Sequence, residues 1–313
     1  MVKKILITGG AGCLGSNLLE YFFRQGHEIL IIDNFATGRR EVVPDIDGLQ
    51  LIEGSVTDKK LVDQTFDDFK PEVVIHSAAS YKDPHDWRED TRTNVEGTIN
   101  VAQSSMRTGV RKLVHFQTAL CYGNPDRLPI PVDHPLRPFT SYGISKTAGE
   151  LYLLQSSLPV TSLRLANVTG PRLSIGPIPT FYKRLKEGKP CFCSNTKRDF
   201  LDMEDFHSLM NLVVSQDSPS GVFNVSSGES KSMQEVFQAV CNYLSIRPEQ
   251  PPPLVEPSAD DVQEVVLDPS RTEEAFGWRA QVGFEETIRR MLSWYDQYGV
   301  SEIYSHLSEP KKN

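Results

Sequence analysis

The amino-acid sequence predicts an α/β protein with a doubly wound parallel sheet and a smaller α+β domain. In the first half, short apolar runs alternate with stretches of helical periodicity, which is typical of a parallel sheet covered by helices on both faces. After Asn167 this alternation ends, and prolines and glycines gather between Gly170 and Pro179. A chain of 313 residues is long enough for one large domain and a smaller one.

Short runs of apolar residues predict the strands of the sheet. These runs lie at 4–8, 28–33, 51–53, 73–76, 113–116 and 160–165. Between them, apolar residues recur with the period of an α-helix, which predicts helices over 15–25, 91–108 and 142–156.

The second half predicts a return to the sheet and a separate small domain. The segments 198–214 and 222–225 resume the earlier pattern, and 285–295 has the pattern of an amphipathic helix. The segment 248–257 holds five prolines, which exclude a helix there because proline lacks a backbone N–H. We therefore predict a sheet domain over 1–168 with a return at 198–230, and a smaller domain over 169–197 and 231–313.

Composition excludes several classes of function. Lys and Arg total 33 against 41 Asp and Glu, a net charge of −8, so the chain has no overall attraction for nucleic acid. No apolar run reaches the roughly 18 residues of a membrane-spanning helix, and the first apolar run is too short for a signal peptide. Five cysteines are too few for a disulfide scaffold, so we expect a cytoplasmic protein.

A glycine-rich loop between a predicted strand and a predicted helix indicates a dinucleotide site. Gly9, Gly12 and Gly15 allow a tight turn and let backbone N–H groups approach a pyrophosphate. Asp33 ends the next strand, where a carboxylate accepts hydrogen bonds from an adenosine ribose and repels a 2′-phosphate. The pattern favours NAD over NADP. Arg39 and Arg40 follow Asp33 and either weaken this preference or are simply solvated.

A tyrosine and a lysine four residues apart indicate proton-transfer chemistry. Tyr142 and Lys146 share one face of a predicted helix. A phenol has a pKa near 10, but a neighbouring ammonium and a cationic nicotinamide both favour the phenolate. Thr118, just after the fifth predicted strand, supplies a hydroxyl. The alternative is an ordinary surface Tyr and Lys.

These motifs together resemble the extended short-chain dehydrogenases/reductases, a Rossmann-type family, within the group of nucleotide-sugar epimerases and dehydratases. The resemblance extends to about Tyr295 and is strongest to UDP-sugar epimerases of bacterial O-antigen clusters. The motifs that carry it lie at 8–15, 33–38, 76–79, 94–98, 118–123, 142–146, 163–164, 167–171 and 198–200.

The resemblance implies roles for individual residues. Tyr142 is implied as the base, Lys146 as the residue that binds the nicotinamide ribose, and Thr118 as a hydrogen-bond partner of the reacting hydroxyl. It implies a homodimer formed by the helices 91–108 and 142–156. No metal is expected, because Cys191 and Cys193 lack the two further nearby ligands that zinc needs. The residues implied to line NAD are Gly9, Gly12, Cys13, Leu14, Gly15, Asp33, Asn34, Gly38, Ser55, Val56, Ala78, Ala79, Asn94, Tyr142 and Lys146. Those implied to bind the substrate are Thr118, Asn167, Arg198, Val265 and Arg271.

The residues after Thr118 narrow the reaction. Dehydratases of the group carry an Asp-Glu pair there, and the decarboxylating members carry a Glu two positions on, whereas this chain has Ala119 and Leu120. Neither side chain can move a proton. The leading expectation is a UDP-sugar 4-epimerase that works through a 4-keto intermediate. The alternatives are a nucleotide-sugar 4-ketoreductase or dehydrogenase, and a catalytically silent sensor of NAD or sugar nucleotides.

Two departures from the family leave the substrate open. Ser55 replaces an Asp that contacts adenine, and Ser258 stands where an arginine usually binds the second phosphate. Val265, at the position that controls bulk at C2 of the sugar, is small enough to admit an N-acetylhexosamine. Lys82 and His85 either contact a sugar carboxylate or belong to a solvated loop. The bases that could replace the missing arginine are Arg198, Lys183, Arg184 and Arg271.

Overall fold

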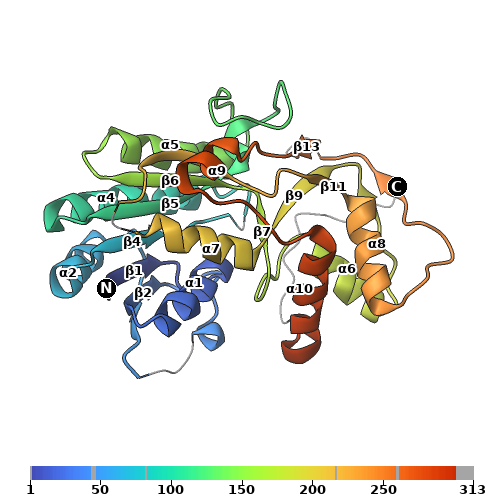
Figure 1. The fold of residues 1–313 in the computed structure, drawn as a ribbon, viewed down its shortest axis with the longest axis horizontal. Helices are drawn as coiled ribbons and strands as arrows, with labels where there is room; N and C mark the ends of the chain where they lie inside the picture. Colours follow the sequence, from blue (N-terminus) through green and yellow to red (C-terminus); the bar gives the residue numbers. More distant parts are fainter. Residues whose placement is uncertain (1, 44–46, 82, 216, 259–260, 301–313) are drawn as a thin grey trace.

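The computed structural model describes residues 2–43, 47–81, 83–215, 217–258 and 261–300 (Figure 1). Its main element is a seven-stranded parallel sheet in the order β10-β6-β5-β4-β1-β2-β3. The order reverses between β1 and β4, which is the switch point of a doubly wound sheet. The predicted fold class is therefore confirmed. The strands are β1 (Lys4–Thr8), β2 (Glu28–Asp33), β3 (Gln50–Glu53), β4 (Val73–His76), β5 (Lys112–Thr118), β6 (Val160–Leu165) and β10 (Gly221–Val225).

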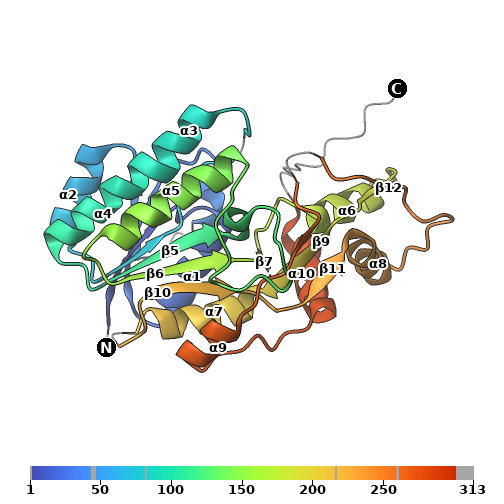
Figure 2. The same cartoon turned by 90° about the horizontal axis from the view of Figure 1, so that it is seen from above.

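Helices cover both faces of this sheet (Figure 2). One face packs against α1 (Cys13–Arg24) and α7 (Met203–Val213). The other packs against α2 (Lys59–Phe69), α4 (Gly97–Thr108) and α5 (Ser141–Gln155). The apolar faces of these helices are removed from water when they pack on the sheet, and the sheet becomes buried on both sides. This burial of apolar surface is the main driving force for the architecture.

A second group of elements forms beside the carboxyl ends of the sheet. Its three helices share one hydrophobic core. Strand β9 lies in the centre of a small sheet, between β11 and β13, and also pairs with β7. The elements are β7 (Asn167–Thr169), α6 (Pro177–Lys186), β8 (Cys193–Ser194), β9 (Lys197–Asp202), β11 (Ser230–Ser232), α8 (Met233–Leu244), β12 (Leu254–Val255), β13 (Glu264–Val265) and α10 (Phe284–Tyr298).

Three local features differ from the sequence prediction. The helix expected over 91–108 is a short helix, α3 (Trp87–Thr91), then a π-helical turn over Arg92–Glu96, then α4. The predicted return to the sheet is divided, because β10 joins the main sheet while β9 pairs within the small one. The helices α2, α6, α8 and α9 (Ser270–Phe276) were not predicted.

A buried ion pair fixes α5 to the sheet. The guanidinium of Arg164 on β6 donates to both carboxylate oxygens of Glu150, at 3.2 and 2.8 Å. Arg164 also donates to the hydroxyl of Tyr122 at 3.0 Å, and Ser162 donates to Glu150 at 2.6 Å. Every charged atom of the pair therefore has a partner, which a desolvated ion pair requires.

Removing one member of this pair should be costly. We expect Arg164→Met to lower the free energy of unfolding by about 3–5 kcal/mol, because it leaves the Glu150 carboxylate buried without its counter-ion. Urea denaturation measures the change. The control is Arg279→Met, which removes an exposed pair with Glu273 and should leave stability close to that of the starting protein. Equal effects of the two substitutions would contradict this account.

Candidate active site

The glycine-rich loop after β1 has no room for a side chain at Gly9 or Gly15. Gly9 has φ of 69°, and an added Cβ would lie 2.7 Å from the backbone nitrogen of Ala78. At Gly15, an added Cβ would lie 2.2 Å from the carbonyl oxygen of Gly9. Gly12 is the N-cap of α1 and provides no side chain to cap it. This leaves the first turn of α1 open to an anion, so the loop fits a pyrophosphate.

Asp33 occupies the position that a ribose-binding carboxylate needs. It ends β2 and is buried, and its two oxygens accept the N–H groups of Ala11 and Phe35, both at 2.8 Å. Burial raises the pKa of Asp33, while these two hydrogen bonds lower it. Gly38 approaches the same carboxylate so closely that an added Cβ would lie 2.8 Å from Oδ1. The carboxylate is therefore held in one orientation by the loop itself.

The other residues predicted to line NAD divide into two groups. Cys13, Leu14, Asn34, Ala78 and Ala79 lie half-buried or exposed around the carboxyl ends of β1, β2 and β4. Ser55 is half-buried and hydrogen-bonds the hydroxyl of Thr57 at 2.9 Å. Val56 is fully packed in the core, and its carbonyl accepts the Asn100 side chain. Val56 can therefore offer a ligand little of its side chain.

Asn94 has a structural role that the sequence did not predict. It lies fully buried in the π-helical turn, where its Nδ2 donates to the Ser80 carbonyl and to the Ser145 hydroxyl, at 2.9 and 3.0 Å. Its Oδ1 accepts the N–H of Ser80 at 2.9 Å. These partners occupy the side chain that we expected to line the cofactor. Asn94 instead joins the segment after β4 to α5.

The catalytic candidates meet at the carboxyl end of β5. Thr118 is the last residue of β5, and a 3₁₀ turn over Ala119–Tyr122 follows it. The first turn of α5 lies against this turn, because Gly143 leaves room for the Leu120 carbonyl. Tyr142 is in that first turn and Lys146 in the next. Among the described residues, the Thr118 hydroxyl accepts the N–H of Leu120 and donates to no acceptor.

Burial governs the protonation of both side chains on α5. Lys146 is fully buried, which lowers its pKa from 10.5 to about 7. Burial raises the pKa of Tyr142, and Tyr81 and Asp90 raise it further. In the protein without cofactor, burial therefore outweighs any effect of Lys146 on the pKa of Tyr142, and the expectation that Lys146 and a cationic nicotinamide together favour the phenolate stays a prediction.

Two buried histidines lie beneath this helix. His76 on β4 hydrogen-bonds the hydroxyls of Thr8 and Thr98, and burial lowers its pKa to about 3. The ring of His115 stacks on that of His76 at 5.6 Å, but neither of its nitrogens has a partner among the described residues. Both imidazoles are held neutral by burial, and Lys146 adds to this effect.

Three residues predicted to bind substrate gather on the small sheet. Asn167 on β7 donates to the Asp199 carbonyl at 2.9 Å. Arg198 on β9 pairs with Asp261, and Val265 on β13 is the register partner of Arg198. Burial lowers the pKa of Arg198, although Asp261 opposes that shift. Since Thr118 pairs with Leu165 at the end of β6, this sheet starts next to the catalytic candidates.

Arg271 is not part of this group. Its guanidinium lies over the ring of Phe223 at 5.3 Å and beside Gly221, the first residue of β10. It therefore lies at the amino end of a parallel strand, whereas Thr118 lies at the carboxyl edge. We withdraw Arg271 from the substrate-binding set. Arg184 donates to the Pro190 carbonyl, and Lys82 lies outside the described residues.

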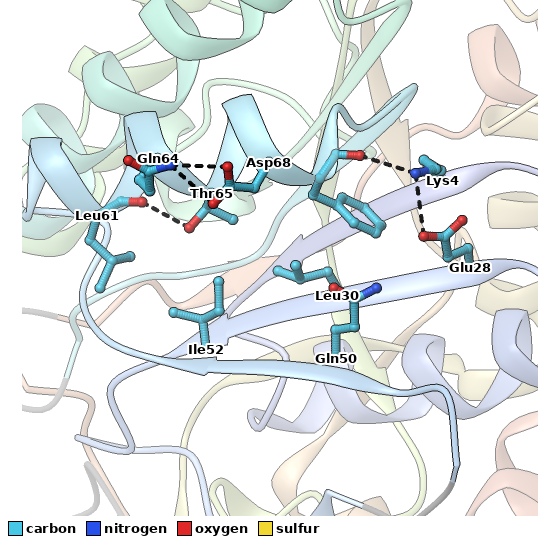
Figure 3. Close-up of a pocket in the computed structure, with 10 residues that line it drawn as sticks. Lys4, Glu28, Leu30, Gln50, Ile52, Leu61, Gln64, Thr65 and Asp68 are labelled. Atoms are coloured by element: carbon cyan, nitrogen blue, oxygen red, sulfur yellow. Dashed lines mark hydrogen bonds and ion pairs between the residues drawn. The ribbon is translucent and has the colours of Figure 1, made fainter.

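A cavity of about 430 Å³ lies elsewhere, between α2 and the edge of the sheet (Figure 3). Its lining includes Lys4, Glu28 and Gln50, the first residues of β1, β2 and β3. The rest of the lining comes from the same strands and from α2, and no catalytic candidate is part of it, so this cavity is not the catalytic site. The described residues contain no cluster of three or more His, Cys, Asp or Glu suited to a metal, and no helix among them could cross a membrane.

Fold and site together define a class of protein. A doubly wound sheet with an open glycine loop and a buried carboxylate at the end of β2 is typical of dinucleotide-binding enzymes.

Comparison with known proteins identifies the family. The model of the NAD dependent epimerase/dehydratase family matches residues 5–226. A UDP-glucose 4-epimerase of Mycolicibacterium smegmatis is 29% identical over 310 residues, which cover 93% of this chain and 98% of the relative. The crystal structure of the Bordetella bronchiseptica enzyme WbmG in complex with NAD and UDP is 62% identical, with a TM-score of 0.93 and 98% of each chain covered. WbmH of the same organism, in complex with NAD⁺, is 41% identical, with a TM-score of 0.90, covering 96% of this chain and 100% of WbmH.

This chain belongs to the NAD dependent epimerase/dehydratase family, and it is an extended short-chain dehydrogenase/reductase. It is an enzyme, and its cofactor is NAD. When bound, NAD supplies the reversible acceptance of a hydride. The sequence prediction of family, enzyme class and cofactor is thereby confirmed.

Burial of Lys146 predicts a pH-dependent cost in stability. The folded protein binds the Lys146 proton less tightly than the unfolded chain, so the cost is fully present below pH 7 and disappears as the pH rises towards 10.5. We expect Lys146→Met to raise the free energy of unfolding of the nucleotide-free protein by about 1–3 kcal/mol at pH 6.5, and by less at pH 9. Urea denaturation at the two pH values tests this. A destabilised variant at pH 6.5 would contradict it.

Proposed function

We propose that this protein is an NAD-dependent UDP-sugar 4-epimerase that acts on a hexose or an N-acetylhexosamine. The observation that carries the proposal is the Thr118, Tyr142 and Lys146 set, followed directly by two aliphatic residues. Ala119 is buried and Leu120 is half-buried beside Thr118, so neither position supplies the extra acid and base of a dehydratase. The similarity to UDP-glucose 4-epimerases and to WbmG, crystallised with UDP, supports a UDP-linked substrate.

Each catalytic side chain has a separate task in this proposal. Tyr142 accepts the proton of the sugar C4 hydroxyl at its phenolate oxygen and later returns it. Thr118 donates its hydroxyl proton to the same sugar oxygen, because its own oxygen already accepts the Leu120 N–H. Lys146 binds the nicotinamide ribose. The positive charge of the oxidised cofactor offsets the burial that otherwise keeps Tyr142 protonated.

The small sheet carries the residues that we propose bind the nucleotide. Arg198 is mostly buried and already paired with a carboxylate, so it is oriented towards a single anionic partner. We propose that the diphosphate takes the place of Asp261 on Arg198 and that this compensates for Ser258, three residues before Asp261. Asn167 lies on the neighbouring strand and is exposed. Together they give the diphosphate one charged and one amide contact.

Val265 leaves the choice of sugar open. It is buried in a small apolar cluster with Ala119 and Cys121, which lie one and three residues after Thr118. A short side chain here favours room for an N-acetyl group at C2. We propose a cytoplasmic enzyme of O-antigen biosynthesis, since the sequence motifs resemble those of UDP-sugar epimerases of bacterial O-antigen clusters.

The test is proton NMR of the purified protein with UDP-hexoses, UDP-N-acetylhexosamines and UDP-uronic acids, without added cofactor. Conversion of one sugar to its C4 epimer supports the proposal. Tyr142→Phe should lose about 10²–10⁴-fold in turnover and keep its bound NAD, because only the proton acceptor is removed. The control is Tyr298→Phe, at an exposed tyrosine on α10. Products that form only with added NAD⁺ or NADH would favour the ketoreductase or dehydrogenase instead.

We also propose that the enzyme is a homodimer formed through α4 and α5, which lie side by side on the outer face of the molecule (Figure 2). This face exposes a row of apolar side chains that a soluble protein normally covers. They are Met106, Ile144, Leu151, Tyr152 and Leu154, each 37–56% exposed.

Charges placed on this face should dissociate the dimer. We expect the starting protein to have about twice its chain mass of 35.2 kDa. The double variant Ile144→Glu with Leu151→Glu should have the mass of one chain, because two carboxylates from each chain would be desolvated in the interface. Light scattering coupled to size exclusion measures both. Leu254→Glu, on β12 in the smaller domain, is the matched control. A monomeric starting protein would refute the dimer.

A further inference from the structure

We propose that Gln117 is a positioning residue, whose side-chain amide fixes the distance between the strand that carries Thr118 and the helix that carries Lys146. Its Nε2 donates to the backbone carbonyl of Lys146 at 3.0 Å. Its Oε1 accepts the backbone N–H of Thr118 at 2.8 Å. One planar group therefore connects the main chains of two catalytic candidates. Its effect on catalysis rests on the proposed function, whereas the bridge is a feature of the fold.

The surroundings make this bridge rigid. Gln117 is 2% exposed, so water does not compete for either hydrogen bond. The Lys146 carbonyl has two lone pairs and can accept the Gln117 amide in addition to its bond within the helix. The side-chain amide of Gln117 both donates and accepts a hydrogen bond at the distance that separates it from these two backbone groups. A residue lacking either capacity would leave a buried backbone group without its partner.

The bridge complements two others along α5. Ser141 donates to Asp90 at 2.7 Å, and Ser145 accepts the Asn94 amide at 3.0 Å. Both of those act through serine side chains. Gln117 acts on the backbone of Lys146 itself, so it sets how far the helix stands above β5. That height decides whether the Tyr142 and Thr118 oxygens can reach one sugar hydroxyl together, and catalysis is sensitive to errors of about 1 Å.

The first test compares two substitutions. Gln117→Met keeps the length and removes both hydrogen bonds, so kcat for the epimerised sugar should fall about 10- to 100-fold with little change in KM. Gln117→Glu can still donate to the Lys146 carbonyl while its carboxyl group is protonated, but not once it ionises. Its kcat, divided by that of the starting protein at each pH, should therefore fall as the pH rises. An unchanged kcat for Gln117→Met, or a constant ratio for Gln117→Glu, would overturn the proposal.

A matched control separates positioning from stability. Thr161→Val, near the amino end of β6, keeps the side-chain shape and removes two hydrogen bonds, one donated to the Pro219 carbonyl and one accepted from Lys112. It should lower the melting temperature to a similar extent and leave kcat unchanged. If Thr161→Val loses as much kcat as Gln117→Met, the loss reflects general destabilisation and the positioning role is refuted.

A second readout distinguishes failure of this proposal from failure of the proposed function. Affinity for NADH, followed by its fluorescence after the bound NAD has been removed, does not depend on the sugar. We expect Gln117→Met to bind NADH about threefold more weakly, because Lys146 is displaced from the ribose. If the starting protein epimerises no sugar, the proposed function fails, and a weakened NADH affinity still supports the Gln117 bridge. Unchanged NADH affinity in Gln117→Met would count against the bridge in either case.

Discussion

The candidate site depends on which face helix α5 turns towards the sheet, because its polar and apolar faces are exchanged relative to an ordinary surface helix. An amphipathic helix normally turns its apolar stripe to the core, but α5 turns small and polar residues to the sheet and exposes several large apolar ones. Hydrogen bonds therefore replace apolar contacts between α5 and the sheet. Because hydrogen bonds are directional, they fix the rotation of the helix and its distance from the sheet. The buried residues are Gly143, Ser145, Lys146, Thr147, Gly149, Glu150 and Leu153, and the exposed apolar ones are Ile144, Leu151, Tyr152 and Leu154.

This arrangement holds the reactive groups in place at an electrostatic cost. Burial drives both Lys146 and Tyr142 towards their neutral forms, so the protein alone favours the wrong state for proton abstraction. The ion pair between Arg164 and Glu150 is different, because hydrogen bonds satisfy both of its members. The fold therefore provides the geometry of the site, and in the proposed mechanism the cationic nicotinamide of NAD⁺ supplies the charge that favours the phenolate.

Close backbone approaches shape the carboxyl edge of the main sheet, where the second group of elements begins. Gly9 and Gly15 let the loop after β1 pack without side chains, and Gly143 does the same where α5 meets the turn after Thr118. At the same edge, β6 ends at Leu165, and β7, two residues later, pairs with β9 of the small sheet. The residues proposed to bind the nucleotide sugar therefore lie on strands that start next to the edge of the main sheet that carries the catalytic candidates.

The sequence by itself determined the parallel sheet, the glycine loop, Asp33 and the Thr118, Tyr142 and Lys146 set, because these depend on local periodicity and on spacing along the chain. Their roles in catalysis remain proposals. Tertiary structure decided which polar side chains are already committed to other partners. It assigned Asn94 to a bridge, put Arg271 at the wrong edge of the sheet and placed Gln117 beneath Lys146. Contacts of this kind join residues that are far apart in the chain, and local pattern carries no information about them.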